Sequence, residues 1–502
     1  MKHYWPSFDE FMVLAERGNV IPVYRQLLAD ALTPVMAYER LARPGDAAPE
    51  PNAFLLESVV GGERIARFSF TAADPDVTVT VRRDDMTIRR RGADDEQITT
   101  GDPLGELGKL MGDYHAVDLP GLPRFTGGLV GYAGYDLIRY YEDLGEGPED
   151  DRNLPDLCFG LYRTMVIFDH VSKTIKVTAN AHVTGDPGRA YADAVEQIER
   201  TISVLTAGQG HSVGEISLQG LAQKPYESNV MRADYLATVE ACKEYIRAGD
   251  IFQVVPSQRL AVETTASPFD IYRALRVVNP SPFMFLLNAP DVTLVGSSPE
   301  ILCRVEDGVI TNRPLAGTRP RGATPEEDEA LEAELLADAK ERAEHIMLVD
   351  LGRNDVGRVA EPESIELSDV MTVERYSHVM HIVSNVTGRL AEGMSALDAL
   401  RVTLPVGTVS GAPKIRAMQI IDEFEPTRRG PYAGAVGYLD FSGNMDTCIA
   451  LRTMVFAAGE VYIQAGGGIV ADSVPDAEYA ETLSKARALI RAIEVAEAGF
   501  AE

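Results

Sequence analysis

Basic residues are scarce in this chain of 502 residues, in which 47 lysines and arginines face 76 aspartates and glutamates, giving a formal net charge of −29. This balance argues against nucleic acid as a partner, because binding to phosphates requires basic side chains that displace counterions. It also opposes the binding of an anionic ligand, unless a bound cation or a local group of arginines and lysines compensates. An enzyme of this composition that acts on an anion must therefore carry its positive charge locally.

Cysteines and long apolar runs are also few. The four cysteines, Cys158, Cys242, Cys303 and Cys448, form no CxxC pair and no metal-ligand spacing, which predicts reduced and buried thiols. No stretch approaches the ~18 apolar residues of a membrane span. The first residues, MKHYWPSFDEF, have no apolar core typical of a signal peptide. We therefore expect a cytoplasmic protein without a membrane partner.

The pattern of the chain changes near residue 206. Before it, short β-like runs alternate with turns, and DVTVTVRR and MTIRRR flank Asp84 and Asp85 as a predicted hairpin. Residues 206–228 are rich in glycine, serine and glutamine, which predicts a linker. Long helices and strands follow without regular βα alternation, which indicates an α+β fold. We expect an N-terminal domain over 15–205 and a catalytic domain over 229–497.

Amphipathic patterns and capping residues predict four long helices after the linker. One ends at Gly249, and another begins with Thr324 as its N-cap and Pro325 as its first helical residue. The expected helices cover residues 231–249, 324–351, 411–424 and 474–498. A single strand is expected over 251–263.

The last of these helices carries a group of charges on one face. Ser473 and Pro475 are expected to start it, and Glu478, Glu481 and Lys485 follow at i, i+3 and i+7. An apolar strand before it runs into Gly466, Gly467 and Gly468, whose bare backbone N–H groups can approach a ligand. Two carboxylates at this spacing suit Mg²⁺, although a solvated charged face has the same pattern.

Other polar residues lie in apolar surroundings. Glu344 lies where a helix turns from charged to apolar, and either a metal or the arginines of LGRNDVGR would offset the cost of burying it. Arg452 interrupts the apolar strand CIALRTMVF, which indicates an anionic partner. His381 has apolar neighbours and could be structural or functional. Composition and spacing lead to an acidic enzyme, Mg²⁺-dependent, that handles a small carboxylate.

The segment LPVGTVSGAPKIRAM superficially resembles a phosphate-binding loop. It lacks the GK[ST] ending, and Pro413 interrupts it. A glycine turn that leads into a helix is still a general anion site, with Thr408, Ser410 and Lys414 as its polar groups.

Eight long motifs occur in a fixed order in the C-terminal half: GSSPEIL, PLAGTRPRG, AEHIMLVDLGRNDVGR, YSHVMHIVSNVTG, LPVGTVSGAPKIRAM, GPYAGAVGY, ALRTMVF and QAGGGIVADSVPDAEYAETLSKARAL. Through them the chain resembles the chorismate-utilising enzymes from about residue 15 to 495. Within that family it is most similar to the branch of anthranilate synthase component I. The resemblance implies a two-domain α+β fold with a β-sandwich core surrounded by helices, and chorismate held mainly by the C-terminal domain.

The resemblance also implies roles for individual residues. Glu344 and Glu478, with Glu481 beside them, would bind Mg²⁺, which holds the ring carboxylate of chorismate. Glu300 matches the general acid that protonates the departing C4 hydroxyl, a task for which burial would raise its pKa. His381 matches a residue that assists the loss of pyruvate, and Thr318 is the third predicted catalytic residue. The predicted substrate contacts are Thr408, Tyr432, Arg452, Gly466, Gly467, Gly468 and Lys485.

Two departures from related enzymes narrow the expected reaction. Aminodeoxychorismate synthases usually carry a lysine at the position of Ala316, and its amine can attack the ring. Isochorismate and salicylate synthases place a basic lysine at the position of Gln253, because water must be deprotonated. Alanine and glutamine together select amination at C2 by ammonia, followed by elimination of pyruvate to give anthranilate.

Partners follow from the same resemblance. None of the four cysteines has the glycine-framed setting of an amidotransferase nucleophile, so ammonia is expected from a separate glutamine amidotransferase subunit. The expected assembly is a heterotetramer or a homo-oligomer. A feedback site for L-tryptophan is implied at Glu57, Ser58, Pro282, Phe283, Met284 and Tyr438. Phe283 stands where the family often has tyrosine. The alternatives are an aminodeoxychorismate synthase component I and a catalytically silent tryptophan-binding homologue.

Overall fold

The computed structural model describes most of the chain. The described residues are 3–28, 30–42, 52–58, 67–207, 215–375 and 379–499. Residues 208–214 of the predicted linker lie outside these ranges. So do 376–378, which belong to the motif YSHVMHIVSNVTG, and 59–66, which follow the predicted tryptophan-site residues Glu57 and Ser58.

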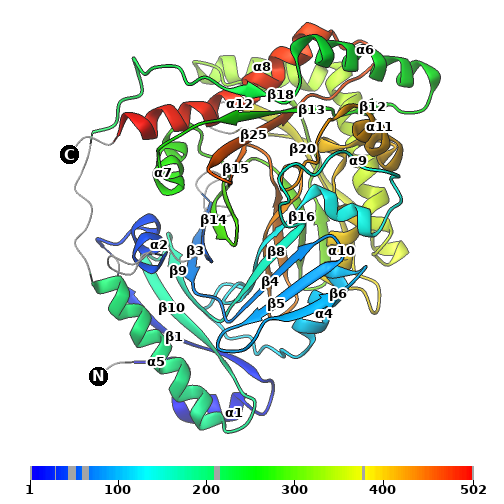
Figure 1. The fold of residues 1–502 in the computed structure, drawn as a ribbon. Coiled ribbons are helices and arrows are strands. Elements are labelled where there is room, and N and C mark those ends of the chain that lie inside the picture. Colours follow the sequence, from blue (N-terminus) through cyan, green and yellow to red (C-terminus); the bar gives the residue numbers. More distant parts are fainter. Residues whose placement is uncertain are drawn as a thin grey trace.

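An eleven-stranded antiparallel sheet combines strands from both halves of the chain (Figure 1). Its order is β1-β10-β9-β3-β2-β14-β15-β24-β25-β13-β11. The bounds are β1 (Val20–Leu28), β2 (Ala53–Glu57), β3 (Phe68–Ala73), β9 (Thr164–Asp169), β10 (Thr174–His182), β11 (Glu227–Ser228), β13 (Ser257–Val262), β14 (Phe283–Ala289), β15 (Val292–Ser298), β24 (Thr453–Ala457) and β25 (Glu460–Gly466). The halves join where β2 pairs with β14, with Glu57 opposite Met284.

A twelve-stranded antiparallel sheet is mixed in the same way. Its order is β18-β20-β17-β16-β23-β22-β7-β8-β4-β5-β6, and β19 also pairs with β20. The bounds are β4 (Val77–Arg82), β5 (Asp85–Arg90), β6 (Glu96–Thr99), β7 (Gly128–Ala133), β8 (Leu157–Tyr162), β16 (Ile301–Glu306), β17 (Val309–Asn312), β18 (Leu315–Pro320), β19 (Glu366–Arg375), β20 (Val379–Arg389), β22 (Ala435–Asp440) and β23 (Met445–Ile449). Here the halves join through β7 and β22. A separate pair is formed by β12 (Gln253–Val254) and β21 (Gly411–Ala412).

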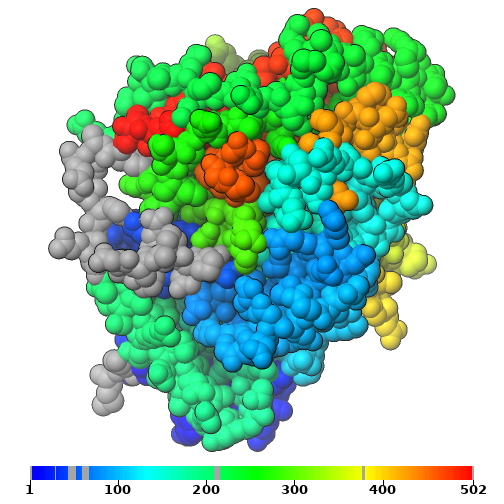
Figure 2. Space-filling model, viewed as in Figure 1, coloured from blue at the N-terminus to red at the C-terminus, as the bar shows by residue number. Residues whose placement is uncertain are grey.

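The two sheets pack face to face. One buried cluster contains Phe54, Phe285 and Leu294 from the first sheet with Tyr132 and Val436 from the second. Alternating side chains of both sheets thus form one apolar layer, as in a β-sandwich. On the visible face of the molecule, N-terminal residues (cyan) lie directly against C-terminal ones (green and orange) (Figure 2).

Helices cover the outer faces of the sandwich. Their apolar faces complete two further clusters, one on each sheet. The helices are α1 (Phe8–Leu14), α2 (Pro34–Ala42), α4 (Pro103–Gly112), α5 (Pro187–Thr206), α6 (Arg232–Ala248), α7 (Pro268–Val278), α8 (Pro325–Ala337), α9 (Ala339–Gly357), α10 (Ala396–Thr403), α11 (Lys414–Phe424) and α12 (Pro475–Ala498), with 3-10 turns η1 (Tyr135–Tyr140), η2 (Pro362–Ser364) and η3 (Gly407–Val409). The predicted α+β fold with a sandwich core is confirmed.

Several predicted elements are confirmed and others are wrong. The hairpin around Asp84 and the helix ending before Gly249, which is left-handed at φ +85°, occur as predicted. The helix expected over 324–351 is wrong, because it breaks at Asp338 into α8 and α9. The strand expected over 251–263 divides into β12 and β13 around Val255 and Pro256.

Three smaller expectations also need correction. The helix expected from residue 411 begins at Lys414, because Gly411 and Ala412 pair with β12 instead. Val474, not Ser473, is the N-cap of α12. The hydroxyl of Ser473 accepts a 3.0 Å hydrogen bond from Val470 N in the preceding turn. Arg452 lies between β23 and β24, not within a strand.

The chain crosses between the two sheets at two adjacent points. From β15 to β16 it passes through Glu300, and from β23 to β24 it passes through Arg452. The crossings are tied together, since Ile449 N donates to Glu300 O at 3.0 Å and Ser297 N donates to Arg452 O at 3.1 Å. The sandwich thereby brings a predicted acid and a predicted anion-binding arginine to one place.

The helices differ from membrane-spanning ones. Within the described ranges, none of them combines the length and the apolar composition that crossing a membrane requires.

Candidate active site

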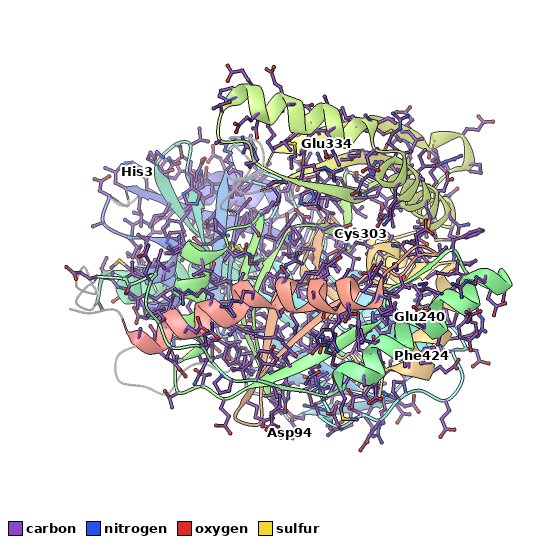
Figure 3. The ribbon with its side chains drawn as sticks, turned by 90° about the horizontal axis from the view of Figure 1, so that it is seen from above. His3, Asp94, Glu240, Cys303, Glu334 and Phe424 are labelled. Carbon is purple, nitrogen blue, oxygen red and sulfur yellow. The ribbon has the colours of Figure 1, made fainter. Side chains whose placement is uncertain are left out.

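A cavity of about 640 Å³ opens beside the two crossings. Its walls come from β12, β18, α9, β20, η3, the end of β25 and α12. Seen from above, α12 crosses the molecule, with Glu334 of α8 towards one side and Glu240 of α6 and Phe424 of α11 towards the other (Figure 3). The predicted site residues that line the cavity are Glu300, Thr318, Glu344, His381, Thr408, Tyr432, Arg452, Gly466, Gly468, Glu478, Glu481 and Lys485.

Glu300 is a buried carboxyl group with properties of a general acid. It is 5% exposed, and burial raises its pKa to about 8 against the opposing effects of hydrogen bonds and of Arg452. Thr408 Oγ1 donates to its Oε1 at 2.9 Å, and the backbone of Leu315 donates a further hydrogen bond. At neutral pH the group is therefore mostly protonated, as proton donation requires.

His381 and Thr318 lie together on neighbouring strands. Nδ1 of His381 is 2.9 Å from Gly317 O and 3.1 Å from Thr318 Oγ1. A carbonyl oxygen only accepts, so Nδ1 carries the proton and the lone pair lies on Nε2. Burial lowers the pKa of His381, so the ring is neutral at pH 7 and can accept a proton.

Arg452 is a half-buried cation without a counter-ion in the described part of the chain. Burial lowers its pKa, and no described carboxylate forms an ion pair with it. Its backbone is left-handed at φ +48°, which costs about 1–3 kcal/mol for a residue other than glycine. Tyr432 is 4% exposed, and burial raises the pKa of its phenol to about 12. A guanidinium and a neutral hydroxyl thus face the cavity, ready for an anion.

The turn after β25 brings bare backbone close to the acidic groups. A Cβ atom on Gly467 would lie 3.0 Å from Glu478 Oε2, and one on Gly468 would lie 2.5 Å from Gln253 Nε2. Gly467 does not line the cavity itself. Lys485 Nζ donates to Gly466 O at 2.8 Å and pairs with Glu481 at 2.7 Å. These contacts explain why side chains are missing from this turn.

The three predicted metal ligands line the cavity from α9 and α12. Burial raises the pKa of Glu344 and of Glu478, and the charge of Glu481 raises both further. Gln253 Nε2 donates to Glu344 Oε1 at 3.3 Å. Among the residues described, no three acidic, histidine or cysteine side chains are gathered closely enough to hold a metal. As a donor set, mutually repelling carboxylate oxygens suit a hard divalent cation.

Sequence reasoning missed two charged residues of this cavity. Lys340 and Glu341 line it from the first turn of α9. They lie four and three residues before Glu344, and this spacing could have placed them on its helix face. Lys340 contributes positive charge that lowers the pKa of Glu344 and of Glu478.

The six predicted tryptophan-site residues line a second cavity of about 570 Å³. Glu57 accepts hydrogen bonds from Tyr272 OH at 2.6 Å and from Arg276 Nη2 at 3.2 Å. The hydroxyl of Ser58 is buried without a hydrogen-bond partner among the described residues. The walls of this second cavity include strands of both halves, β2, β14 and β22. Pro282 lines this cavity and the first one.

Comparison with known proteins agrees with this geometry. Residues 52–491 match the family described as chorismate binding enzyme. Anthranilate synthase component 1 from Acetivibrio thermocellus is 48% identical over 497 residues, covering 98% of this chain and 99% of its own length. The crystal structure of anthranilate synthase component I from Streptococcus pneumoniae is 38% identical, with a TM-score of 0.76 over 92% of this chain and 99% of that one.

A more distant structure shares the fold. The menaquinone-specific isochorismate synthase from Escherichia coli is 17% identical, with a TM-score of 0.67 over 97% of this chain and 98% of that one. The family prediction made from the eight motifs is confirmed: the chain belongs to the chorismate-binding enzymes.

Proposed function

We propose that the chain is the large subunit of an anthranilate synthase, which converts chorismate and ammonia to anthranilate and pyruvate. The observation that carries this proposal is that a protonated Glu300 and a neutral His381 line the same cavity. A relative named for this activity, 48% identical over its whole length, supports the choice.

Glu300 supplies the proton in the first step. Ammonia forms a bond to C2 of the ring while the ring double bonds shift and the bond from C4 to its hydroxyl breaks, and the carboxyl proton leaves with that hydroxyl as water. The ammonium group formed on C2 then loses a proton, to the Glu300 carboxylate or to water, and becomes an amine. The hydrogen bonds from Thr408 and Leu315 hold the carboxyl group in place. Burial keeps it protonated until the substrate arrives.

His381 acts in the second step. Its Nε2 takes the proton from C2 while the bond from the ring to the ether oxygen breaks, so that the ring becomes aromatic and the enolate of pyruvate leaves. That enolate takes a proton at its methylene carbon, from the imidazolium or from water, and becomes pyruvate. The hydrogen bond from Nδ1 to Gly317 O fixes the tautomer that can do this. Thr318 Oγ1, at 3.1 Å, helps to hold the ring.

Two cations and one neutral hydroxyl of the cavity bind the substrate. Arg452, Tyr432 and Lys485 face the space where a carboxylate of chorismate can lie. Glu344, Glu478 and Glu481 would hold Mg²⁺, which neutralises and holds the other carboxylate when it is bound. Cations inside the cavity thereby favour the binding of an anion, although the whole chain has a net charge of −29.

Ala316 and Gln253 favour ammonia as the nucleophile. Ala316 lines the cavity and is 7% exposed, so the wall carries no amine at this point. Gln253 is 3% exposed and donates to Glu344, and an amide is no base. Neither the lysine that attacks the ring nor the lysine that deprotonates water is therefore present at its position, which disfavours the aminodeoxychorismate synthase alternative.

We also propose the cellular setting. Ammonia comes from glutamine through a separate amidotransferase subunit, in a cytoplasmic hetero-oligomer. L-Tryptophan inhibits by binding in the second cavity, which is supported by the position of all six predicted residues there.

The test is identification of the product by fluorescence and mass. Purified chain would be incubated with chorismate, MgCl₂ and ammonium salt at alkaline pH, with and without tryptophan. Anthranilate made from ammonia alone, and suppressed by tryptophan, is the expected result. A para-aminated or hydroxylated ring would refute the reaction, and absence of turnover with tight tryptophan binding would favour the silent homologue.

A further inference from the structure

Arg429 is a fully buried cation close to the catalytic cavity. Its side chain is 2% exposed, and its Nε and Nη2 bind both oxygens of Glu425, at 2.9 and 2.6 Å. Two of the three remaining N–H groups reach backbone carbonyls: Nη1 donates to Val409 O and Nη2 to Val255 O, each at 2.7 Å. One guanidinium therefore joins three separate segments.

The two carbonyls belong to two walls of the catalytic cavity. Val409 follows Thr408, the hydrogen-bond donor to Glu300. Val255 comes two residues after Gln253, the donor to Glu344. The walls also touch directly, since Val255 N donates to Ser410 O at 3.0 Å.

Glu425 extends the same network to β13 and β25. Its Oε1 accepts hydrogen bonds from Ser257 N and Ser257 Oγ, both at 2.8 Å. Gln464 Nε2 donates to Ser257 Oγ at 2.8 Å, and Gln464 lines the cavity. In addition, Cζ of Arg429 lies 5.5 Å from the ring centroid of Tyr432. The ion pair thus contacts η3, the segment between β12 and β13, and the ring of Tyr432, and it reaches β25 through Ser257.

Stability alone gives a poor reason for this ion pair. Removing two charges from water is costly, and apolar replacements of a buried pair are often neutral or stabilising. A guanidinium differs from other side chains in its rigid planar fork, which fixes the angles between several acceptors. The presence of Arg429 at this junction is therefore better explained by the positions that it fixes for the surrounding segments.

We propose that Arg429 and Glu425 are positioning residues of the active site. Neither side chain is among the described residues that line the cavity. They hold the segment of Thr408, the segment of Gln253 and the ring of Tyr432 in register with Glu300. The activity readouts below rest on the proposed function, and the exchange readout does not.

The experiment compares Arg429→Lys with Arg163→Lys. Arg163 is a matched control, because it makes a similar two-nitrogen contact with Asp76, at 2.8 and 2.9 Å, far from this cavity in the N-terminal strands. Lysine keeps the charge but cannot reach both carbonyls. We expect Arg429→Lys to lower kcat at least tenfold, to change KM for chorismate less than threefold, and to displace the alkaline limb of the pH profile. Arg163→Lys should leave all three unchanged.

Hydrogen–deuterium exchange measured by mass spectrometry tests the geometry without catalysis. In Arg429→Lys, amide exchange should increase in residues 253–257 and 407–412 and stay unchanged in β4 and β5. Unchanged exchange in a folded variant, or unchanged kcat and pH profile, would overturn the proposal. If Arg429→Lys does not fold, Glu425→Gln replaces it. That variant keeps the size of the side chain, and wild-type behaviour in both assays would overturn the proposal equally. If wild-type protein makes no anthranilate, only the proposed function fails.

Discussion

The hydroxyl of Thr408 donates a 2.9 Å hydrogen bond to Oε1 of Glu300. This contact joins the 3-10 turn η3 to the crossing from β15 to β16. It lowers the pKa of Glu300, but burial has the larger effect, so the pKa remains raised at about 8. The acidity of Glu300 is therefore set jointly by burial and by hydrogen bonds, of which one comes from this hydroxyl.

Thr408→Val should move the alkaline limb of kcat/KM to higher pH. Valine keeps the shape but removes the hydrogen bond to the ionised carboxylate, so the proton is held more tightly. The profile would be measured at a constant concentration of free ammonia, because that concentration itself depends on pH. Thr447→Val, which removes a buried hydroxyl bonded to Cys303 O, is the control. An identical limb in both variants would contradict the role of Thr408.

Glu300→Gln should lower kcat by about 10²–10⁴-fold, the usual contribution of a general acid, while chorismate still binds. Stability gives a second measurement. Between the unfolded pKa near 4.5 and the folded pKa of about 8, the native state retains a proton that the unfolded state has lost, so wild-type stability falls as pH rises. Melting temperatures at pH 5 and pH 8 should differ less in the variant. An equal pH dependence would place the proton elsewhere.

Glu478→Gln should raise the Mg²⁺ concentration needed for half-maximal activity at least tenfold without loss of fold. The carboxylate supplies an oxygen and a charge that the amide supplies only in part. Asp476→Asn is a control on the same helix, since Asp476 pairs with Arg232 on α6. Identical magnesium titrations of wild type and Glu478→Gln would remove Glu478 from the metal site.

His381→Gln should stop the reaction after amination. Glutamine cannot accept the proton from C2, so an aminated ring that still carries its pyruvyl group should accumulate and be visible by mass. Because the pKa of His381 is lowered by burial, the acid limb of the wild-type profile should lie below about 6.5. His182→Gln, on β10 beside Tyr114, is the control. Anthranilate formed at the wild-type rate would exclude this role.

Ser58→Phe should relieve tryptophan inhibition at least tenfold and leave kcat within twofold. The phenyl ring would enter the cavity of about 570 Å³ that Ser58 lines, away from Glu300. Inhibition curves at fixed chorismate would measure the effect. If inhibition persists unaltered, the regulatory site lies elsewhere.

The predictability of the elements depended on local signals. Thr324, Pro325 and Gly249 marked helix ends correctly because caps and left-handed glycines act within a few residues. The break at Asp338 has no proline or glycine. Asp338 caps α9 by accepting from Lys340 N and Glu341 N, and it pairs with Arg319 of β18 at 2.9 Å. That partner is distant in sequence, so periodicity alone predicts one helix.

In the N-terminal half, a long helix was not predicted. It was expected to contain only short strands and turns, yet α5 is one of the longest helices described. Asp186 and Pro187 at its start were a usable signal, since aspartate caps helices and proline fits the first position.

Most members of the candidate site were predictable, whereas Lys340, Glu341 and the arrangement of the site were not. Motif resemblance identified residues that lie in one cavity. The crossing of the chain between sheets, which places Arg452 beside the strand end before Glu300, depends on pairings between β15 and β24. Such long-range pairing leaves no local trace, and Arg429 was missed for the same reason, since its partners lie up to 174 residues away.

The sharing of strands has a consequence for how the polypeptide can be divided. Because β2 pairs with β14 and β7 pairs with β22, neither half of the chain supplies all the strands of either sheet. Severing the backbone between α5 and α6 would leave each fragment with bare strand edges that only the other can cover. The whole chain is therefore needed for a complete fold, and two fragments would be active only if they reassembled.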